Sequence, residues 1–147
     1  MRGNECGDVG IGAKGNDGNG TNSGHVRVYQ YDGAWVQIGQ DIDGEAARDK
    51  SGWSVSLSNN GTIVAIGAHG NDDNGSMSGH VRVYGYDRAG VSWDQLGQAI
   101  DGEASYDKSG WSGSWSNIGG GDAIGAGDND DNGDSTARDL VEPDDDS

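Results

Sequence analysis

Acidic and amide side chains recur in a loop pattern that could hold a cation. The stretch "GNDDNGSMSGHVRVY" (70–84) places Asp72, Asn74 and Gly75 directly before a strand-like run. Calcium takes six to eight oxygen ligands, and alternating Asp and Asn positions aim several side chains inward while glycine permits a sharp turn. The same residues also suit a hairpin turn, in which Asn, Asp and Gly satisfy their own backbone. Both interpretations are open.

Three copies of this loop differ in how completely they supply the calcium-loop pattern. In the first two copies the first ligand position is occupied by Gly15 and Gly70. Only the third copy has the full spacing, with Asp139 near the closing position. The turn interpretation therefore fits the loop better, and calcium binding is the alternative. The candidate metal ligands are Asp17, Asn19, Asp72, Asn74, Asp128, Asp130 and Asn132.

A second acidic motif, "IDGEA…DKSGW", occurs twice in the chain. Paired carboxylates can carry out glycosidase chemistry when they lie about 5–10 Å apart. However, both sets recur with the repeat, and this favours structural contacts between units, including an ion pair with Lys50 or Lys108. The carboxylates concerned are Asp43, Glu45 and Asp49, repeated as Asp101, Glu103 and Asp107.

Histidine and tryptophan positions also recur. His25 and His80 have no nearby nucleophile or Cys/His cluster, so we expect them on strand surfaces rather than in catalysis. Only 31% of the residues are hydrophobic and phenylalanine is absent. Aromatic rings must then supply much of the core, because each buries on the order of 150–250 Å². Trp35, Trp93 and Trp115 could stack on sugars, but we expect most of them in the core.

These motifs belong to an internal repeat. His25 recurs as His80, and Trp53 recurs as Trp111. One complete unit has four strand candidates between turn signals and shows no sustained helical period. Four antiparallel strands in about 40–50 residues are typical of a propeller blade. The strand candidates are Trp53–Ser58, Thr62–Ala68, His80–Tyr86 and Ser92–Gln98.

The chain holds about two and a half of these units, whereas propellers close with about four to eight blades. The sequence therefore predicts an all-β, incomplete and open array of four-stranded antiparallel blades. Its open blade edges would permit self-association. The predicted divisions are a partial first blade (1–51), a complete second blade (52–109), a partial degenerate third blade (110–134) and an acidic disordered tail (135–147).

Charge and hydropathy exclude several classes of function. The net charge is −16, and the nine basic residues are scattered, so nucleic acid is not expected as a partner. No apolar run approaches the roughly 18 residues of a membrane helix, so membrane insertion is not expected. Cys6 is the single cysteine, so no internal disulfide forms. The start of the chain lacks the apolar core of a signal peptide.

The succession "GWSVSLSNNGTIVAIGAHG…SGHVRVYGY" (52–86) resembles the FG-GAP repeat of the integrin α-subunit propeller and its microbial and algal relatives. Gly52-Trp53 stands where that family has its aromatic-glycine pair. Residues 66–69 stand where it has its Gly-Ala-Pro signature, and residues 79–84 stand where it has its Gly-x-Val-Tyr strand. The family keeps its calcium loop between the first two strands. Here that place is "SNNGT" (58–62) without a carboxylate, so the resemblance does not imply the familiar calcium site.

Together these features predict a non-enzymatic binding or adhesion module that recognises a protein or glycan through its loops. Calcium is the candidate stabilising ion. Glycosylation-type sequons at Asn19, Asn60 and Asn74, together with the resemblance, favour an extracellular or cell-surface location. The alternatives are a fragment of a carbohydrate-active propeller enzyme and a degenerate fragment with no independent function.

Overall fold

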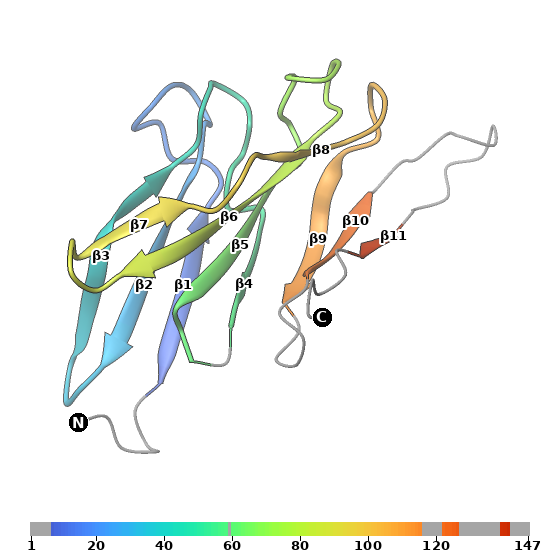
Figure 1. The fold of residues 1–147 in the computed structure, drawn as a ribbon. Helices are drawn as coiled ribbons and strands as arrows, with labels where there is room; N and C mark the ends of the chain where they lie inside the picture. Colours follow the sequence, from blue (N-terminus) through green and yellow to red (C-terminus); the bar gives the residue numbers. More distant parts are fainter. Residues whose placement is uncertain (1–6, 59, 116–121, 127–138, 142–147) are drawn as a thin grey trace.

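The chain folds into three antiparallel β-sheets that stand side by side (Figure 1). The computed structural model describes residues 7–58, 60–115, 122–126 and 139–141. Within these ranges the regular structure consists of strands alone, and the sheets do not close into a barrel. The predicted all-β, incomplete array of propeller type is therefore confirmed for the described part of the chain.

Each sheet corresponds to one copy of the sequence repeat, and we call the copies units 1, 2 and 3. The sheet of unit 1 has the order β1-β2-β3, formed by β1 (Asp8–Ala13), β2 (His25–Tyr31) and β3 (Trp35–Asp43). The sheet of unit 3 has the order β11-β10-β9, formed by β9 (Ser109–Trp115), β10 (Asp122–Ala126) and β11 (Asp139–Val141).

The sheet of unit 2 has the order β4-β5-β6-β7, and the short strand β8 also pairs with β6. All four predicted strands of this unit are present, and β8 is an addition to them. The short β7 forms the outer edge, as its sequence predicts. The strands are β4 (Ser54–Leu57), β5 (Ile63–Ala68), β6 (His80–Asp87), β7 (Ser92–Gln95) and β8 (Ile100–Asp101).

Alternating apolar residues set the register of the sheet in unit 2. Val55 of β4 lies opposite Ile66 of β5, and Leu57 lies opposite Val64. Tyr84 of β6 lies opposite Val64 on the other side. Directly opposite side chains share one face of a sheet, so these residues form one apolar surface.

That apolar surface packs against unit 1 to form the main hydrophobic core. Unit 1 contributes Val26 and Val28 of β2 and Ile42 of β3, all of them buried. Full burial of such a side chain is worth about 1.5–3 kcal/mol. The core side chains of unit 2 are Val64, Ile66, Tyr84 and Trp93. Aliphatic residues of β2, β3 and β5, together with one tyrosine and one tryptophan of unit 2, therefore form this core.

The expectation that aromatic rings supply much of the core is wrong for Trp35 and right for Trp93. Trp93 is buried because it reaches unit 1, where its Nε1 donates to the carbonyl oxygen of Ile38 at 3.0 Å. Trp35 occupies the equivalent place in unit 1, where the described residues put no earlier unit beside it. It is 56% exposed and contacts Tyr31. The side chain of Trp115 lies outside the described residues.

A smaller core lies on the other face of unit 2, where Val81 is buried and Val83 packs beside it. These two valines are the repeat counterparts of Val26 and Val28. On this face β9 packs against β4 and β5. Units 1 and 2 thus each present their valine pair to the unit that follows in the sequence.

Strand β11 lies within the segment 135–147, which composition alone assigns to a disordered tail. Its backbone pairs with β10, with Leu140 opposite Ile124. The apolar pair Leu140-Val141 supplies a short strand inside an otherwise acidic segment.

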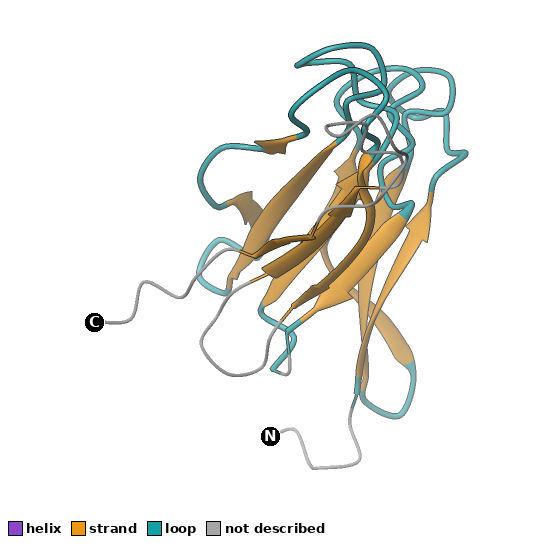
Figure 2. Ribbon diagram, turned by 90° about the vertical axis from the view of Figure 1, so that its right-hand side faces the viewer, coloured by secondary structure: helices purple, strands orange, loops and turns teal. Residues whose placement is uncertain are grey.

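Four long loops meet at one end of the molecule, which we call the loop end (Figure 2). They alternate between hairpin loops within a unit and connections between units. In chain order they cover residues 14–24, 44–53, 69–79 and 102–108.

Candidate functional site: the loop end and the junction of units 1 and 2

The loops of the loop end are joined to one another by repeated backbone hydrogen bonds. Arg48 N donates to the carbonyl oxygen of Thr21 at 2.8 Å, and its counterpart Tyr106 N donates to Ser76 at 2.7 Å. Arg48 and Tyr106 also share a left-handed backbone, with φ of 70° and 68°. This conformation is uncommon for residues with a side chain. The repeat therefore builds the same strained loop geometry after unit 1 and after unit 2.

The predicted aspartate ligands close their own loops. Asp17 Oδ1 accepts a hydrogen bond from Asn22 N at 2.8 Å, and Asp72 Oδ1 accepts one from Met77 N at 2.7 Å. Both carboxylates thus act as the turn interpretation expects, by satisfying nearby backbone donors.

The predicted amide ligands connect the hairpin loops to the following connections. Asn19 Nδ2 donates to the carbonyl oxygen of Gly44 at 2.8 Å. Asn74 Nδ2 donates to Gly102 at the same distance. Calcium binding by these loops stays a prediction. The third copy, with Asp128, Asp130 and Asn132, lies outside the described residues.

The hairpin between β4 and β5 occupies the place where the resembling family keeps its calcium loop. Asn60 Oδ1 accepts hydrogen bonds from Ser58 Oγ at 2.9 Å and from Thr62 Oγ1 at 2.7 Å. The sequence of this hairpin supplies no carboxylate. An amide-centred turn therefore fills the position.

The junction of units 1 and 2 brings together three acidic side chains around one buried histidine. His80 of β6 is fully buried, and its Nδ1 lies 3.7 Å from Glu45 Oε1 and 3.8 Å from Asp101 Oδ1. Ligand atoms of Glu45, Asp73 and His80 all lie within 4.8 Å of one another. Glu45 belongs to the connection after unit 1, whereas the other members belong to unit 2. We call Glu45, Asp73, His80 and Asp101 the junction cluster.

The junction cluster perturbs the protonation of its own members. Burial raises the pKa of Glu45, and the neighbouring Asp73 and Asp49 carboxylates raise it further, while Arg82 lowers it. Burial and Asp73 also raise the pKa of Asp101. The pKa of His80 falls to about 4, chiefly because burial penalises the imidazolium.

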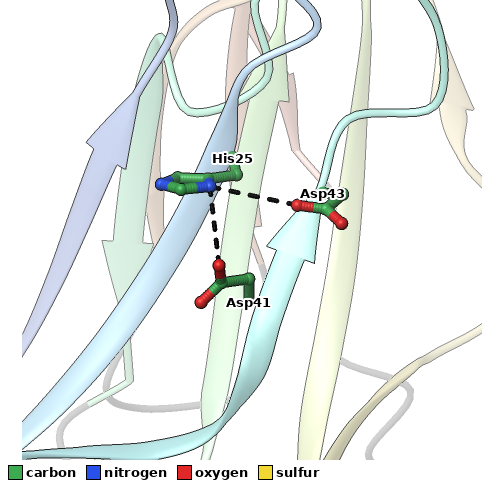
Figure 3. A group of neighbouring side chains, drawn as sticks. All are labelled: His25, Asp41 and Asp43. Carbon is green, nitrogen blue, oxygen red and sulfur yellow. Dashed lines mark ion pairs between the residues drawn. The ribbon is translucent and has the colours of Figure 1, made fainter. Parts of the chain in front are cut away.

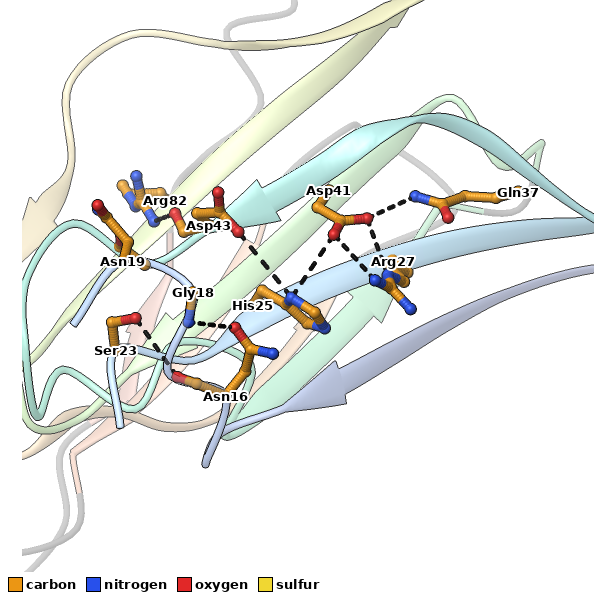
Figure 4. A network of polar contacts seen from close by, with 11 residues as sticks. Asn16, Gly18, Asn19, Ser23, His25, Arg27, Gln37, Asp41, Asp43 and Arg82 are labelled. Carbon is orange, nitrogen blue, oxygen red and sulfur yellow. Dashed lines mark hydrogen bonds and ion pairs between the residues drawn. The ribbon is translucent and has the colours of Figure 1, made fainter. Parts of the chain in front are cut away.

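His25 of unit 1 is the repeat counterpart of His80, and it also faces two carboxylates (Figure 3). Its Nδ1 lies 3.8 Å from Asp41 Oδ2 and 3.9 Å from Asp43 Oδ1. Figure 4 shows that Asp41 is held by other partners as well: Arg27 Nε donates to it at 2.8 Å and Gln37 Nε2 at 2.8 Å. These two donors lower the pKa of Asp41 to about 2.

Polar contacts between units confirm the prediction that the "IDGEA…DKSGW" motif links neighbouring units. Asp49 Oδ2 accepts a hydrogen bond from Asn71 Nδ2 at 2.9 Å, and both side chains are buried. Asn71, rather than Lys50, is therefore the partner. Arg82 donates to the backbone carbonyl oxygen of Asp43 at 2.9 Å, so unit 2 is also hydrogen-bonded to the end of β3.

A hollow of about 390 Å³ opens between the hairpin loops at the loop end. Its lining includes the exposed Arg48, the half-buried Lys50 and Met77, and the exposed Asp72. Two cations thus face a hollow in a protein whose net charge is −16.

A second buried histidine, His69, lies between two tryptophans. Its ring centroid is 4.1 Å from that of Trp53 and 4.9 Å from that of Trp111. Burial, together with the nearby Lys50 and Lys108, lowers its pKa to about 4. His69 is therefore a neutral part of an aromatic cluster.

The sequence comparison agrees with this architecture. Residues 42–84, from the end of β3 to β6, match the family model of the FG-GAP repeat. These residues form an FG-GAP repeat. The FG-GAP match contains Glu45, Asp73 and His80, so it spans the junction of units 1 and 2. No curated protein matches the chain in sequence. The described part of the chain has no helix that is long and apolar enough to cross a membrane.

Sequence reasoning missed the junction cluster. The expectation that His25 and His80 lie on strand surfaces is wrong, because both residues are buried. One signal could have drawn attention to the site. Asp73 replaces Gly18 of the first copy, which adds a carboxylate that unit 1 lacks.

Proposed function

We propose that this protein is a non-enzymatic binding module that recognises a protein or glycan partner through its loop end. The hollow at the loop end is the observation that supports the proposal. Loops from two successive units line it, and Arg48 and Lys50 supply positive charge there. An acidic group on the partner, such as a carboxylate of a protein side chain or of a sugar, suits this lining.

The carboxylates near the loop end give less support to an enzyme. Glu45 and Asp73 form a close carboxylate pair. The first copy of the repeat lacks this pair, because Gly18 stands in the place of Asp73. Neither residue belongs to the lining of the hollow. A substrate in the hollow would therefore not reach the pair directly.

We also propose an extracellular or cell-surface location. The FG-GAP repeat supports it, as do the sequon asparagines Asn19 and Asn74, which lie in exposed loops. Mass spectrometry of the protein isolated from its own cells would test the location, since glycans on these asparagines form only along the secretory route.

The binding proposal is tested with the purified chain on a glycan array and on a panel of extracellular proteins. Each hit is then measured with the Arg48→Ala and Lys50→Ala variants. The matched control is Arg88→Ala, which removes the same charge from an exposed turn at the opposite end. We expect loss of about tenfold or more in affinity for the loop-end variants, equivalent to about 1.4 kcal/mol, and little change for the control.

Two outcomes would contradict the proposal. Equal binding by the loop-end variants and the wild type would place the partner elsewhere on the molecule. Release of shortened sugars from any glycan hit would favour the carbohydrate-active enzyme instead.

A further inference from the structure

We propose that Glu45, Asp73 and His80 bind a divalent transition-metal ion, of the kind that zinc represents, at the junction of units 1 and 2. The site is separate from the predicted calcium loops and from the partner-binding hollow. Its members come from both units, so the ion would connect them.

The buried imidazole of His80 is the first argument. Its side chain has no exposed surface, and neither ring nitrogen has a hydrogen-bond partner among the described residues. A buried polar group without a partner is costly and rare in folded proteins. The Nδ1 atom faces the carboxylates of Glu45 and Asp101 at 3.7 and 3.8 Å, which is too long for a hydrogen bond. A cation bound between these atoms would satisfy that nitrogen.

The geometry of the carboxylates is the second argument. Ligand atoms of Glu45, Asp73 and His80 lie within 4.8 Å of one another. An ion between them needs ligand distances of about 2.0–2.2 Å, and side-chain shifts below one ångström achieve this. Glu45 is 41% exposed and can rotate, and the exposed side gives the ion a path of entry. Asp101, also beside His80, adds a fourth ligand or a partner for bound water.

The charge of the cluster favours a cation. Three carboxylates surround His80. Among the basic side chains, Arg82 lowers the pKa of both Glu45 and His80. Arg82 is itself engaged, because it donates to the carbonyl oxygen of Asp43 and lies over the ring of Tyr84.

The donor set selects the kind of ion. Calcium prefers six to eight oxygen ligands, whereas one imidazole with two or three carboxylates suits zinc and related transition metals. The two other buried histidines are less available for an ion, although His25, Asp41 and Asp43 also place their ligand atoms within 4.8 Å of one another. His25 shares Asp41 with Arg27 and Gln37, and His69 lies among tryptophans and lysines.

The experiment is a calorimetric titration of the whole metal-free chain with zinc chloride. We expect one saturable site in the wild type. The variants Glu45→Gln, Asp73→Asn and His80→Gln should each weaken it by at least about tenfold, since loss of even an outer partner costs 10–100-fold. His25→Gln and Glu103→Gln are the matched controls and should bind as the wild type does. Glu103 is the counterpart of Glu45, but Arg138 takes the place of His80 in the next copy.

Nitrogen NMR of the histidine side chains supplies a second readout. Zinc should shift the Nδ1 resonance of His80 and leave that of His69 in place. Should His80→Gln fail to fold, the exposed residues Glu45 and Asp73 still allow the test. Absence of saturable zinc binding, or zinc binding that survives all three substitutions, would overturn the proposal. Calcium binding as tight as that of zinc would also overturn it, because an acidic cluster alone would then explain the uptake of ions.

Discussion

The sequence "GHVRVY" occurs in both β2 and β6, yet its two copies lie in different surroundings. In β6, His80 and Arg82 are buried against unit 1 and its connection. In β2, the equivalent Arg27 is partly exposed and pairs with Asp41 of its own sheet. The same motif thus builds a contact between units in one place and a contact within a sheet in the other. The difference comes from whether an earlier unit is present beside the strand.

The strands beside this motif show the same contrast. Val64 and Ile66 of β5 are 0% and 1% exposed, whereas their counterparts Val9 and Ile11 of β1 are 37% and 49% exposed. Equal residue types at equal positions therefore differ in burial by up to half of their surface. Unit 1 presents to solvent the face that unit 2 buries. Four predictions test this contrast.

The largest effect is expected from truncating one isoleucine in each copy. Ile66→Ala should lower the free energy of unfolding by about 2–5 kcal/mol, because it removes buried methylene groups and leaves a cavity. Ile11→Ala should lower it by about 1 kcal/mol or less, because half of that side chain already meets water. Urea denaturation of both variants measures the two values.

Equal losses for the two isoleucine variants would show that the outer face of unit 1 is covered in solution. A dependence of the wild-type unfolding midpoint on protein concentration would then identify a second copy as the cover. Neither result is expected from a chain whose first sheet is open on that side.

The second prediction concerns pH and the position that carries His69 in unit 2 and Lys14 in unit 1. The folded chain binds a proton at His69 near pH 4, whereas the unfolded imidazole binds one near 6.5. As the pH falls through this window the unfolded state takes up the proton first, so the free energy of unfolding decreases. The loss at His69 is about 3 kcal/mol at most.

The variant His69→Gln isolates this effect. The raised pKa values of Glu45, Asp49 and Asp101 act in the opposite direction, and they are common to both proteins. The difference in unfolding free energy between wild type and variant should therefore shrink as the pH falls from about 7 to 4. A constant difference over that range would show that His69 titrates alike in both states.

The third prediction compares Asn71 with its counterpart Asn16. Each side chain accepts a hydrogen bond from the backbone two residues later, but Asn71 also donates to the buried Asp49. Asn71→Ala should therefore cost about 1–3 kcal/mol, since it leaves a buried carboxylate without that donor. Asn16→Ala should cost roughly 1 kcal/mol or less. Thermal unfolding of both variants tests the ranking, and a larger loss for Asn16→Ala would contradict it.

The strands could be predicted from the sequence because their signals are local. Alternation over 80–86 and the turn at 60–61 depend on residues next to one another in the chain, and both are found. The burial of His80 could not be predicted in this way. It depends on Glu45 and the connection around it, and these lie more than thirty residues earlier in the sequence. Contacts between units are set by packing, which the strand pattern alone does not encode.

Packing between units also explains why the prediction failed for Trp35. Trp35 and Trp93 occupy equivalent positions, so the sequence alone gives no reason to treat them differently. Trp93 is buried because it packs against unit 1, where its Nε1 donates to the carbonyl oxygen of Ile38. A position in a repeat therefore predicts a side chain's direction better than its exposure.

The fourth and smallest effect is expected at Arg27, which distinguishes the His25 group from the junction cluster. Arg27 and Gln37 hold the pKa of Asp41 at about 2. In the variant Arg27→Gln this pKa should rise towards the ordinary value of 3.8, because the strongest donor and its charge are removed. Carbon NMR of the Asp41 carboxyl group over a pH titration measures the change.

Loss of the ion pair between Arg27 and Asp41 should also make zinc binding at His25 more similar to zinc binding at His80. With Arg27 removed, Asp41 and Asp43 are both available beside His25, 3.8 and 3.9 Å from its Nδ1. The variant should then show weak zinc binding at His25 in addition to the site at His80. It should stay weaker than the junction cluster, because unit 1 has Gly18 in place of Asp73. A pKa of Asp41 that stays near 2 would mean that Gln37 and His25 suffice to hold its charge, and the contrast between the sites would then rest on Asp73 and Glu45 alone.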